Sequence, residues 1–197
     1  MLRIKCSAKK PARTQSRETL PVSGGQDLDI KEFNMTSDFE LVDKILDGFY
    51  YEDSGVSRAN QQGFDQTDIF VDRYFNEDFA EIIYNSITKD TDLSKVATLF
   101  DVLVWSTPDN GTRLEELVHN WITSDNKTKV QIILLRQDWF PRQDREENIK
   151  VLEKVKLKFP DLAELCNYHL EEFDYQKKTG LRRIELLFKI ADKLKKS

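Results

Sequence analysis

Apolar residues recur at intervals of three and four along most of the chain after Met35, and this spacing constrains the fold more than any other feature. Because an α-helix makes one turn in about 3.6 residues, such spacing gathers apolar side chains on one helix face. Only 7 Gly and 5 Pro occur in 197 residues, whereas a β-sandwich or barrel needs a turn signal about every 8–12 residues. The sequence therefore predicts an all-α fold for residues 35–197, built of stacked antiparallel helical hairpins in a solenoid-like or irregular bundle.

The first part of this domain is expected to hold two helical regions separated by a loop. Ser37 and Glu40 can form a capping box, and Gly48 is a typical residue just after a helix. Residues 51–63 are polar and aperiodic, which predicts a loop, and a second helical region is expected from Asp65 to Ile87. The apolar face of the first helix is expected to include Phe39, Val42, Ile45 and Leu46.

The pattern is clearest from residue 92 onward. Asp92 can cap a helix whose apolar residues, Trp105 among them, cover so much of its circumference that we expect it to be central and buried. Residues 130–135 fit either a helix or a short buried strand, and their polar flanks favour a helix capped by Ser124 or Asp125. The remaining helices are expected at 112–123, at 142–158, from Pro160 to near Gly180, and after Gly180.

A weak internal period accompanies these helices. Trp105, Trp139 and Phe173 are spaced by 34 residues each, and each lies near a predicted helix end. Helix-hairpin repeats have about that period. The spacing is therefore a hint of stacked hairpins.

The charge is distributed unevenly. Residues 1–17 carry six basic side chains and no acidic one, and residues 1–34 are interpreted as a flexible basic leader arm. A nucleic-acid-binding tail, a mitochondrial presequence and a start at Met35 are the other interpretations of the arm. Residues 18–100 carry 18 acidic against 6 basic side chains, whereas residues 101–197 are nearly balanced, with 17 acidic and 18 basic side chains. The acidic half is the main electrostatic feature of the chain.

Composition also restricts the compartment and the class of partner. The two cysteines, Cys6 and Cys166, cannot form a disulfide framework, so a cytoplasmic protein is expected. No segment approaches the roughly 18 apolar residues of a membrane span, so no membrane partner is expected. The sequence pI of about 5.2 argues against nucleic acid as the main partner.

Motifs that carry chemistry are absent from the sequence. It contains no glycine-rich phosphate loop and no Gly-x-Ser-x-Gly nucleophile elbow. Cys166 and His169 are spaced to share a metal or to act as nucleophile and base, but no second Cys/His pair completes a zinc site. Both lie within a Leu/Phe stripe, which favours a core position. We therefore expect no catalytic residue, no metal and no cofactor.

The remaining candidate is a protein-binding surface in the acidic half. An acidic surface accelerates association with a basic partner and helps to exclude wrong partners. Aromatic candidates for the contact lie around the loop that precedes these aspartates. The predicted partner-binding residues are Tyr50, Tyr51, Phe64, Asp65, Asp68 and Asp72.

In general character the chain resembles the small acidic all-α immunity proteins encoded beside polymorphic or contact-dependent bacterial toxins. The resemblance rests on residues 92–174, around the segments 99–111 and 129–135, which is less than half of the chain. It implies a non-catalytic protein that binds a basic toxin domain and blocks it, without a cofactor. Two other classes stay open: a helical-repeat scaffold that binds peptides in a groove, and an enzyme of an unfamiliar helical family that uses Cys166 and His169.

Overall fold

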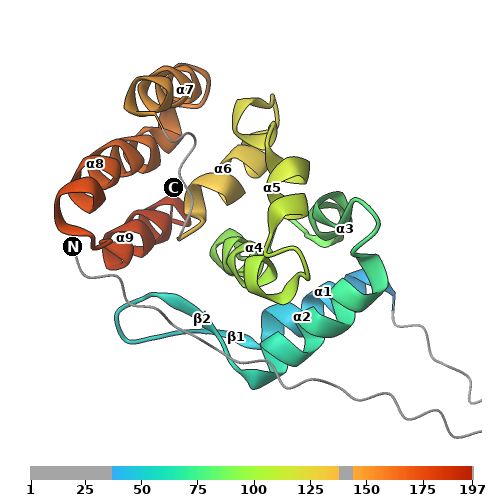
Figure 1. Ribbon diagram of the computed structural model, residues 1–197. Helices are drawn as coiled ribbons and strands as arrows, with labels where there is room; N and C mark the ends of the chain where they lie inside the picture. Colours follow the sequence, from blue (N-terminus) through green and yellow to red (C-terminus); the bar gives the residue numbers. More distant parts are fainter. Residues whose placement is uncertain (1–36, 138–143, 197) are drawn as a thin grey trace, which may run out of the picture. The chain divides into compact units, whose positions relative to one another are not determined.

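The computed structural model describes residues 37–137 and 144–196, which belong to one compact unit (Figure 1). The arm expected at residues 1–34 lies outside the described residues. The described part is an all-α bundle, as the apolar spacing predicts, and it also contains one small β-hairpin. Its α-helices are α1 (Asp38–Asp47), α2 (Gln61–Tyr74), α3 (Phe79–Ser86), α4 (Leu93–Ser106), α5 (Thr112–Val118), α6 (Lys127–Leu135), α7 (Arg145–Lys158), α8 (Ala163–Thr179) and α9 (Ile184–Leu194). Two short 3-10 helices, Trp121–Thr123 and Pro160–Leu162, precede α6 and α8.

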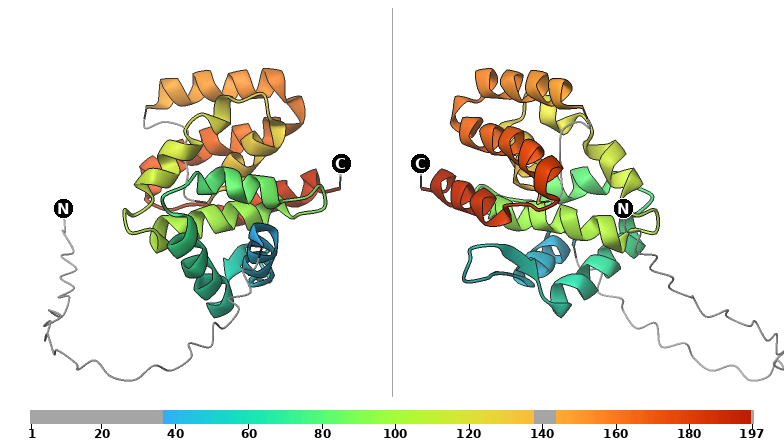
Figure 2. Two further views of the ribbon diagram at one scale, coloured as in Figure 1. Left: turned by 90° about the vertical axis from the view of Figure 1, so that its right-hand side faces the viewer. Right: turned by 60° about the vertical axis from the view of Figure 1, so that its left-hand side comes forward.

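Helix α4 is the centre of the bundle, because it contacts α1, α2, α5, α6 and the hairpin. Residues 96–100 of this helix are all buried, and Leu103 is fully buried. Both views in Figure 2 place α7 and α8 on one side of α4 and the α1–α2 pair on the other. Helix α8 packs against both α7 and α9. The apolar run of α4 therefore forms a core shared by both sides of the molecule.

Polar side chains define where most of the helices begin. The capping box of α1 is present, with the Glu40 amide donating to Ser37 Oγ at 3.3 Å and the Ser37 amide donating to Glu40. Asp92 caps α4 and Gly48 follows α1, as predicted. Helix α6 is capped by Asn126 and not by Ser124 or Asp125, and residues 130–135 are helical. The end of α8 at Gly180, with φ +73°, also confirms the prediction.

Other boundaries differ from the sequence prediction. The second helical region begins at Gln61, capped by Asn60, and it is interrupted after Tyr74 because Asp78 caps a separate helix, α3. Residues 112–123 form α5 and a 3-10 turn in place of one helix. The start expected for α7 at residue 142 lies outside the described residues. Of the three residues in the 34-residue spacing, Trp105 is exposed, Phe173 is half-buried and Trp139 lies outside the described residues.

Residues 51–63 do not form a simple loop, which corrects the sequence prediction. β1 (Phe49–Tyr51) pairs antiparallel with β2 (Ser57–Ala59), with Tyr50 opposite Arg58. Phe49, Val56 and Ser57 are buried at 3% exposure or less, so tertiary packing anchors this short hairpin. Strands of three residues are too short for the alternation of polar and apolar residues that identifies longer strands.

Two large side chains lie elsewhere than expected. Phe39, predicted to face the core, is 46% exposed at the start of α1. Trp105, predicted to be buried, is 79% exposed in the last turn of α4. Residues near both in the sequence are buried, Leu41 after Phe39 and Leu103 and Thr107 around Trp105, so each of the two side chains lies on the outward side of a helix end that is itself packed.

Candidate functional site

Helix α2 presents most of the predicted partner-binding residues on one exposed side. Its inner side is buried through Thr67, Phe70, Val71 and Tyr74, so the opposite side faces solvent. Because residues three and four positions apart share a helix face, the aspartates at 65, 68 and 72 form one row. Phe64 and Ile69, which are 40% and 46% exposed, flank the row. We call Phe64, Asp65, Asp68, Ile69 and Asp72 the acidic face.

No basic side chain in the described part of the chain pairs with the three aspartates of this face. Asp65 accepts a hydrogen bond from Gln61 Nε2 at 2.7 Å, which leaves its charge in place. The neighbouring helix α1 adds further exposed carboxylates at Glu40, Asp43 and Asp47. The α1–α2 pair therefore carries a strongly negative outer surface.

The hairpin is fixed to the start of α2 by two glycines in close contact. A Cβ atom on Gly48 would lie 2.4 Å from the backbone nitrogen of Gly63, which is too close for any side chain. The backbone N–H of Asn60 also donates to the Gly48 carbonyl at 2.9 Å. Tyr50, which follows this contact in β1, is 48% exposed. Tyr50 and Phe64 therefore lie on two segments whose backbones are in direct contact.

Tyr51 has a different environment from the other predicted residues. Its hydroxyl donates to Asp92 and accepts a hydrogen bond from Lys195 Nζ at 2.9 Å, and Lys195 also donates to Asp92 at 2.8 Å. Its ring packs edge-on against Phe188 with centroids 6.4 Å apart. These contacts join the hairpin to the start of α4 and to α9. The structure therefore gives Tyr51 a structural contact that the sequence did not reveal.

Tyr51, Asp92 and Lys195 form a cluster in which burial and the hydrogen bonds among the three side chains shift each pKa. Burial and the neighbouring Asp92 carboxylate raise the pKa of the Tyr51 hydroxyl. Burial acts to raise the pKa of Asp92, but hydrogen bonds from Lys195 and Tyr51 outweigh it, so the pKa is lowered. Lys195 likewise has a raised pKa, because its bonds to Asp92 and Tyr51 outweigh the opposing effect of burial. The cluster is a neutral phenol with an ion pair at pH 7.

Cys166 and His169, the pair considered for chemistry, both lie in the core at 1% exposure or less. Burial raises the pKa of the Cys166 thiol to about 12, so the thiolate required of a nucleophile is not formed near neutral pH. His169 Nε2 donates to the Leu134 carbonyl at 2.7 Å. Burial lowers the pKa of this imidazole to about 4, so it is neutral at pH 7. The imidazole thus joins α8 to α6.

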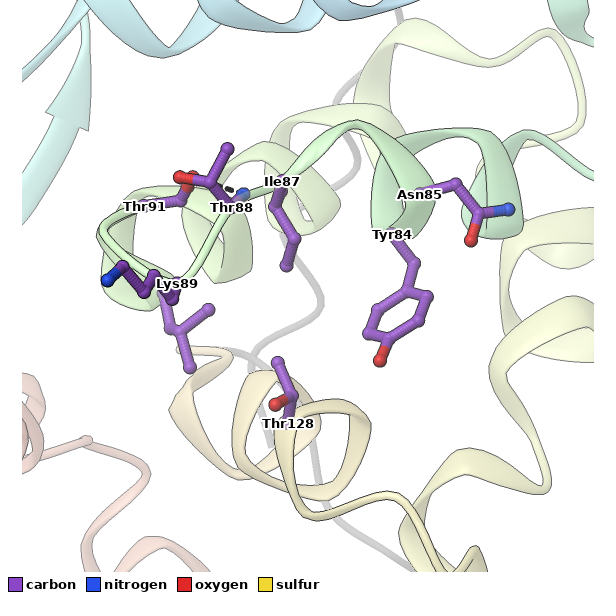
Figure 3. Close-up of a pocket in the computed structure, with 8 residues that line it drawn as sticks. Tyr84, Asn85, Ile87, Thr88, Lys89, Thr91 and Thr128 are labelled. Atoms are coloured by element: carbon purple, nitrogen blue, oxygen red, sulfur yellow. Dashed lines mark hydrogen bonds between the residues drawn. The ribbon is translucent and has the colours of Figure 1, made fainter.

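A cavity of about 390 Å³ opens between the end of α3, the loop before α4 and the start of α6 (Figure 3). The side chains of Tyr84, Ile87 and Thr128 lie around it, and the Thr88 amide donates to Thr91 Oγ1 at 2.8 Å. Its lining holds one cation, Lys89, but no carboxylate, imidazole or thiol. The cavity therefore has no carboxylate or imidazole that could activate Lys89 or its threonine hydroxyls.

Among residues 37–137 and 144–196, no group of three His, Cys, Asp or Glu side chains is placed to hold a metal ion. The helices in those ranges include none with the length and apolarity needed to cross a bilayer.

No protein-family model, no curated protein and no solved structure matches the chain.

Proposed function

We propose that this chain is a non-catalytic binding protein whose acidic face, together with Tyr50, binds a basic protein. The observation that carries the proposal is the acidic face itself. Three aspartates on one side of α2 lack basic partners among the described residues, and two exposed apolar side chains flank them. Exposed apolar side chains beside charges are typical of interfaces, where charge steers the encounter and apolar contact slows dissociation.

The partner that this surface fits best is a toxin domain with a positive active-site cleft, and the chain then acts as an immunity protein in the bacterial cytoplasm. Enzymes that act on nucleic acids have clefts of this sign, because their substrates are polyanions. An acidic protein that occupies such a cleft prevents the substrate from entering. This function requires no catalytic group, and the buried states of Cys166 and His169 are compatible with it.

The test is co-expression of this protein with the product of the adjacent gene. We expect that product to be toxic alone and harmless when this protein is abundant. The triple variant Asp65→Lys/Asp68→Lys/Asp72→Lys should protect poorly, although its fold should be unchanged because all three side chains are exposed. If the adjacent product is harmless alone, or stays toxic beside the wild-type protein, the immunity function is wrong and a scaffold function takes its place.

A further inference from the structure

The two ends of the β1–β2 hairpin are held by contacts of different kinds. Where the hairpin meets α2, the backbones of Gly48 and Gly63 are in direct contact. Nearer the turn of the hairpin, Tyr51 at the end of β1 contacts α9, which Figure 1 shows on the same side of the molecule as that turn. An isolated hairpin of two strands is at best marginally stable in water, so strands of three residues depend on such outside contacts.

The contacts at the turn end come from residues that are far from the hairpin in sequence. Lys195, which directly follows α9, donates through Nζ to the Tyr51 hydroxyl at 2.9 Å and to the Asp92 carboxylate at 2.8 Å. The same ammonium lies 4.8 Å from the centroid of the Tyr51 ring. The other edge-on neighbour of this ring is Phe188 of α9. We call Tyr51, Asp92, Phe188 and Lys195 the clamp.

The clamp is made mainly of polar contacts that are partly in water. The side chains of Lys195 and Asp92 are 38% and 27% exposed. A cavity of about 460 Å³ opens beside them, between the start of α4, α6 and the half-buried Leu194 at the end of α9. An ion pair in such a setting contributes much less to stability than a buried apolar contact does. The clamp can therefore open while the core, including the buried Leu187 and Ile190 of α9, stays folded.

The clamp acts on the residue that precedes Tyr51. Successive side chains of a strand point to opposite faces, so Tyr50 faces away from the side on which Tyr51 is held. Tyr50 is 48% exposed and lies opposite Arg58 in the register of the hairpin. A fixed Tyr51 thus fixes the direction in which Tyr50 points.

We propose that the clamp is a regulatory contact through which the end of α9 controls the order of the hairpin and the position of Tyr50. With Lys195 in place, the turn end of β1 is held and Tyr50 is ready for contact. When Lys195 is released or loses its charge, the turn end of the hairpin frays. Because coupling between two sites is reciprocal, a partner that binds the held form of Tyr50 also holds Lys195 in place. The step that concerns a partner rests on the proposed function, whereas the control of the hairpin does not.

Amide hydrogen exchange of the full chain, without any partner, tests the clamp. Two backbone hydrogen bonds report on the two ends of the hairpin. The Glu52 N–H donates to the Val56 carbonyl at 2.9 Å at the turn end, and the Asn60 N–H donates to the Gly48 carbonyl at 2.9 Å at the α2 end. In Lys195→Met we expect the Glu52 amide to exchange about fivefold faster and the Asn60 amide to exchange at the wild-type rate.

Matched variants separate the clamp from a change of net charge. Lys193→Met removes the same charge from the same helix, where Lys193 pairs with Glu164, and it should leave the Glu52 amide unchanged. Lys195→Arg retains the charge and the donors and should exchange nearly as the wild type does. Tyr51→Phe keeps the ring but removes the hydroxyl. It should act like Lys195→Met, and the two changes together should add little, because both break the same contact.

The effect on binding is measured separately, with the proposed basic partner. Lys195→Met should raise the dissociation rate constant about threefold and Lys193→Met should leave it unchanged, because only the former loosens Tyr50. Failure to find a partner would count against the proposed function and leave the exchange result standing. The clamp is refuted if the Glu52 amide exchanges equally fast in the wild type and in Lys195→Met, or if Lys193→Met accelerates it as much. Equal acceleration of amides in the hairpin and in α7 would likewise refute it, because Lys195 would then support the whole fold and not the hairpin.

Discussion

At the scale of single residues, the buried thiol of Cys166 offers a direct test of the claim that it is a core group. Its pKa of about 12 leaves about a thousandfold less thiolate than an ordinary thiol at pH 8. In a Cys6→Ser variant Cys166 is the single thiol of the chain. We expect it to react with a thiol reagent at least about a thousandfold more slowly in native buffer than in urea. A fast native reaction would instead support a nucleophilic role.

The buried imidazole of His169 makes stability depend on pH. Its native pKa of about 4 lies below the ordinary value of 6.5, so the unfolded chain binds the proton more readily. The contribution of the neutral, buried imidazole to the free energy of unfolding is therefore fully present above pH 6.5, and it is lost as the pH falls from 6.5 towards 4. When the pH is lowered from 7.5 to 5, the titration of His169 should reduce the free energy of unfolding by about 2 kcal/mol.

Carboxylates also contribute to acid destabilisation, so the His169 effect is read as a difference between variants. His169→Gln retains a donor for the Leu134 carbonyl but does not titrate. Urea unfolding at the two pH values should show a smaller loss of stability for His169→Gln than for the wild type. The exposed His119→Gln variant should behave as the wild type does. Equal losses in all three proteins would contradict the assignment.

At the scale of elements, the close approach of Gly48 and Gly63 determines how the hairpin packs on α2. Gly48→Ala would place a Cβ 2.4 Å from the Gly63 nitrogen and 2.6 Å from its Cα, both backbone atoms that cannot turn aside. We expect a loss of more than about 2 kcal/mol from this overpacking. Gly180→Ala is the control, because its φ of +73° strains alanine while open space surrounds the Cβ, and about 1 kcal/mol is expected. Similar losses in both variants would show that the Gly48–Gly63 contact is not tight.

The helices could be predicted from the sequence because most of them have a continuous apolar side and a recognisable cap. Asp92 before α4 and Ser37 before α1 show both features. The hairpin at 49–59 could not be predicted, because β2 packs on α4, which is distant from it in sequence. The exposure of Trp105 could not be predicted either, because apolar residues cover most of the circumference of α4 and periodicity does not show which of them faces outward.

The candidate site was predictable to the same extent. The row of aspartates at 65, 68 and 72 follows directly from helical spacing, and the exposure of Tyr50 and Phe64 agrees with it. Tyr51 differs because its partners, Asp92 and Lys195, lie 41 and 144 residues away in the sequence. Only the fold brings a residue near the C-terminal end of the described part to the hairpin.

At the scale of the whole molecule, the uneven charge should govern the rate at which a basic partner associates. The exposed carboxylates of α1 and α2 attract the partner before contact, and salt screens such charges beyond about 8 Å at physiological ionic strength. The association rate constant with the proposed basic partner should therefore fall as salt rises. Asp65→Lys/Asp68→Lys/Asp72→Lys should lower it on the order of tenfold at low salt.

A variant with the same change in net charge shows whether the position of the charges matters. Glu147, Glu171 and Glu185 are exposed acids on α7, α8 and α9, remote in sequence from the acidic face. Reversing these three to lysine should slow association much less than reversing the aspartates of α2. Tyr50→Ala should act mainly on the dissociation rate constant, raising it by about tenfold, because truncating a central aromatic removes buried contact and not long-range attraction. Stopped-flow association and dissociation measurements separate the two effects. Equal slowing by both charge reversals would mean that net charge alone steers the encounter, and the acidic face would then lose its special role.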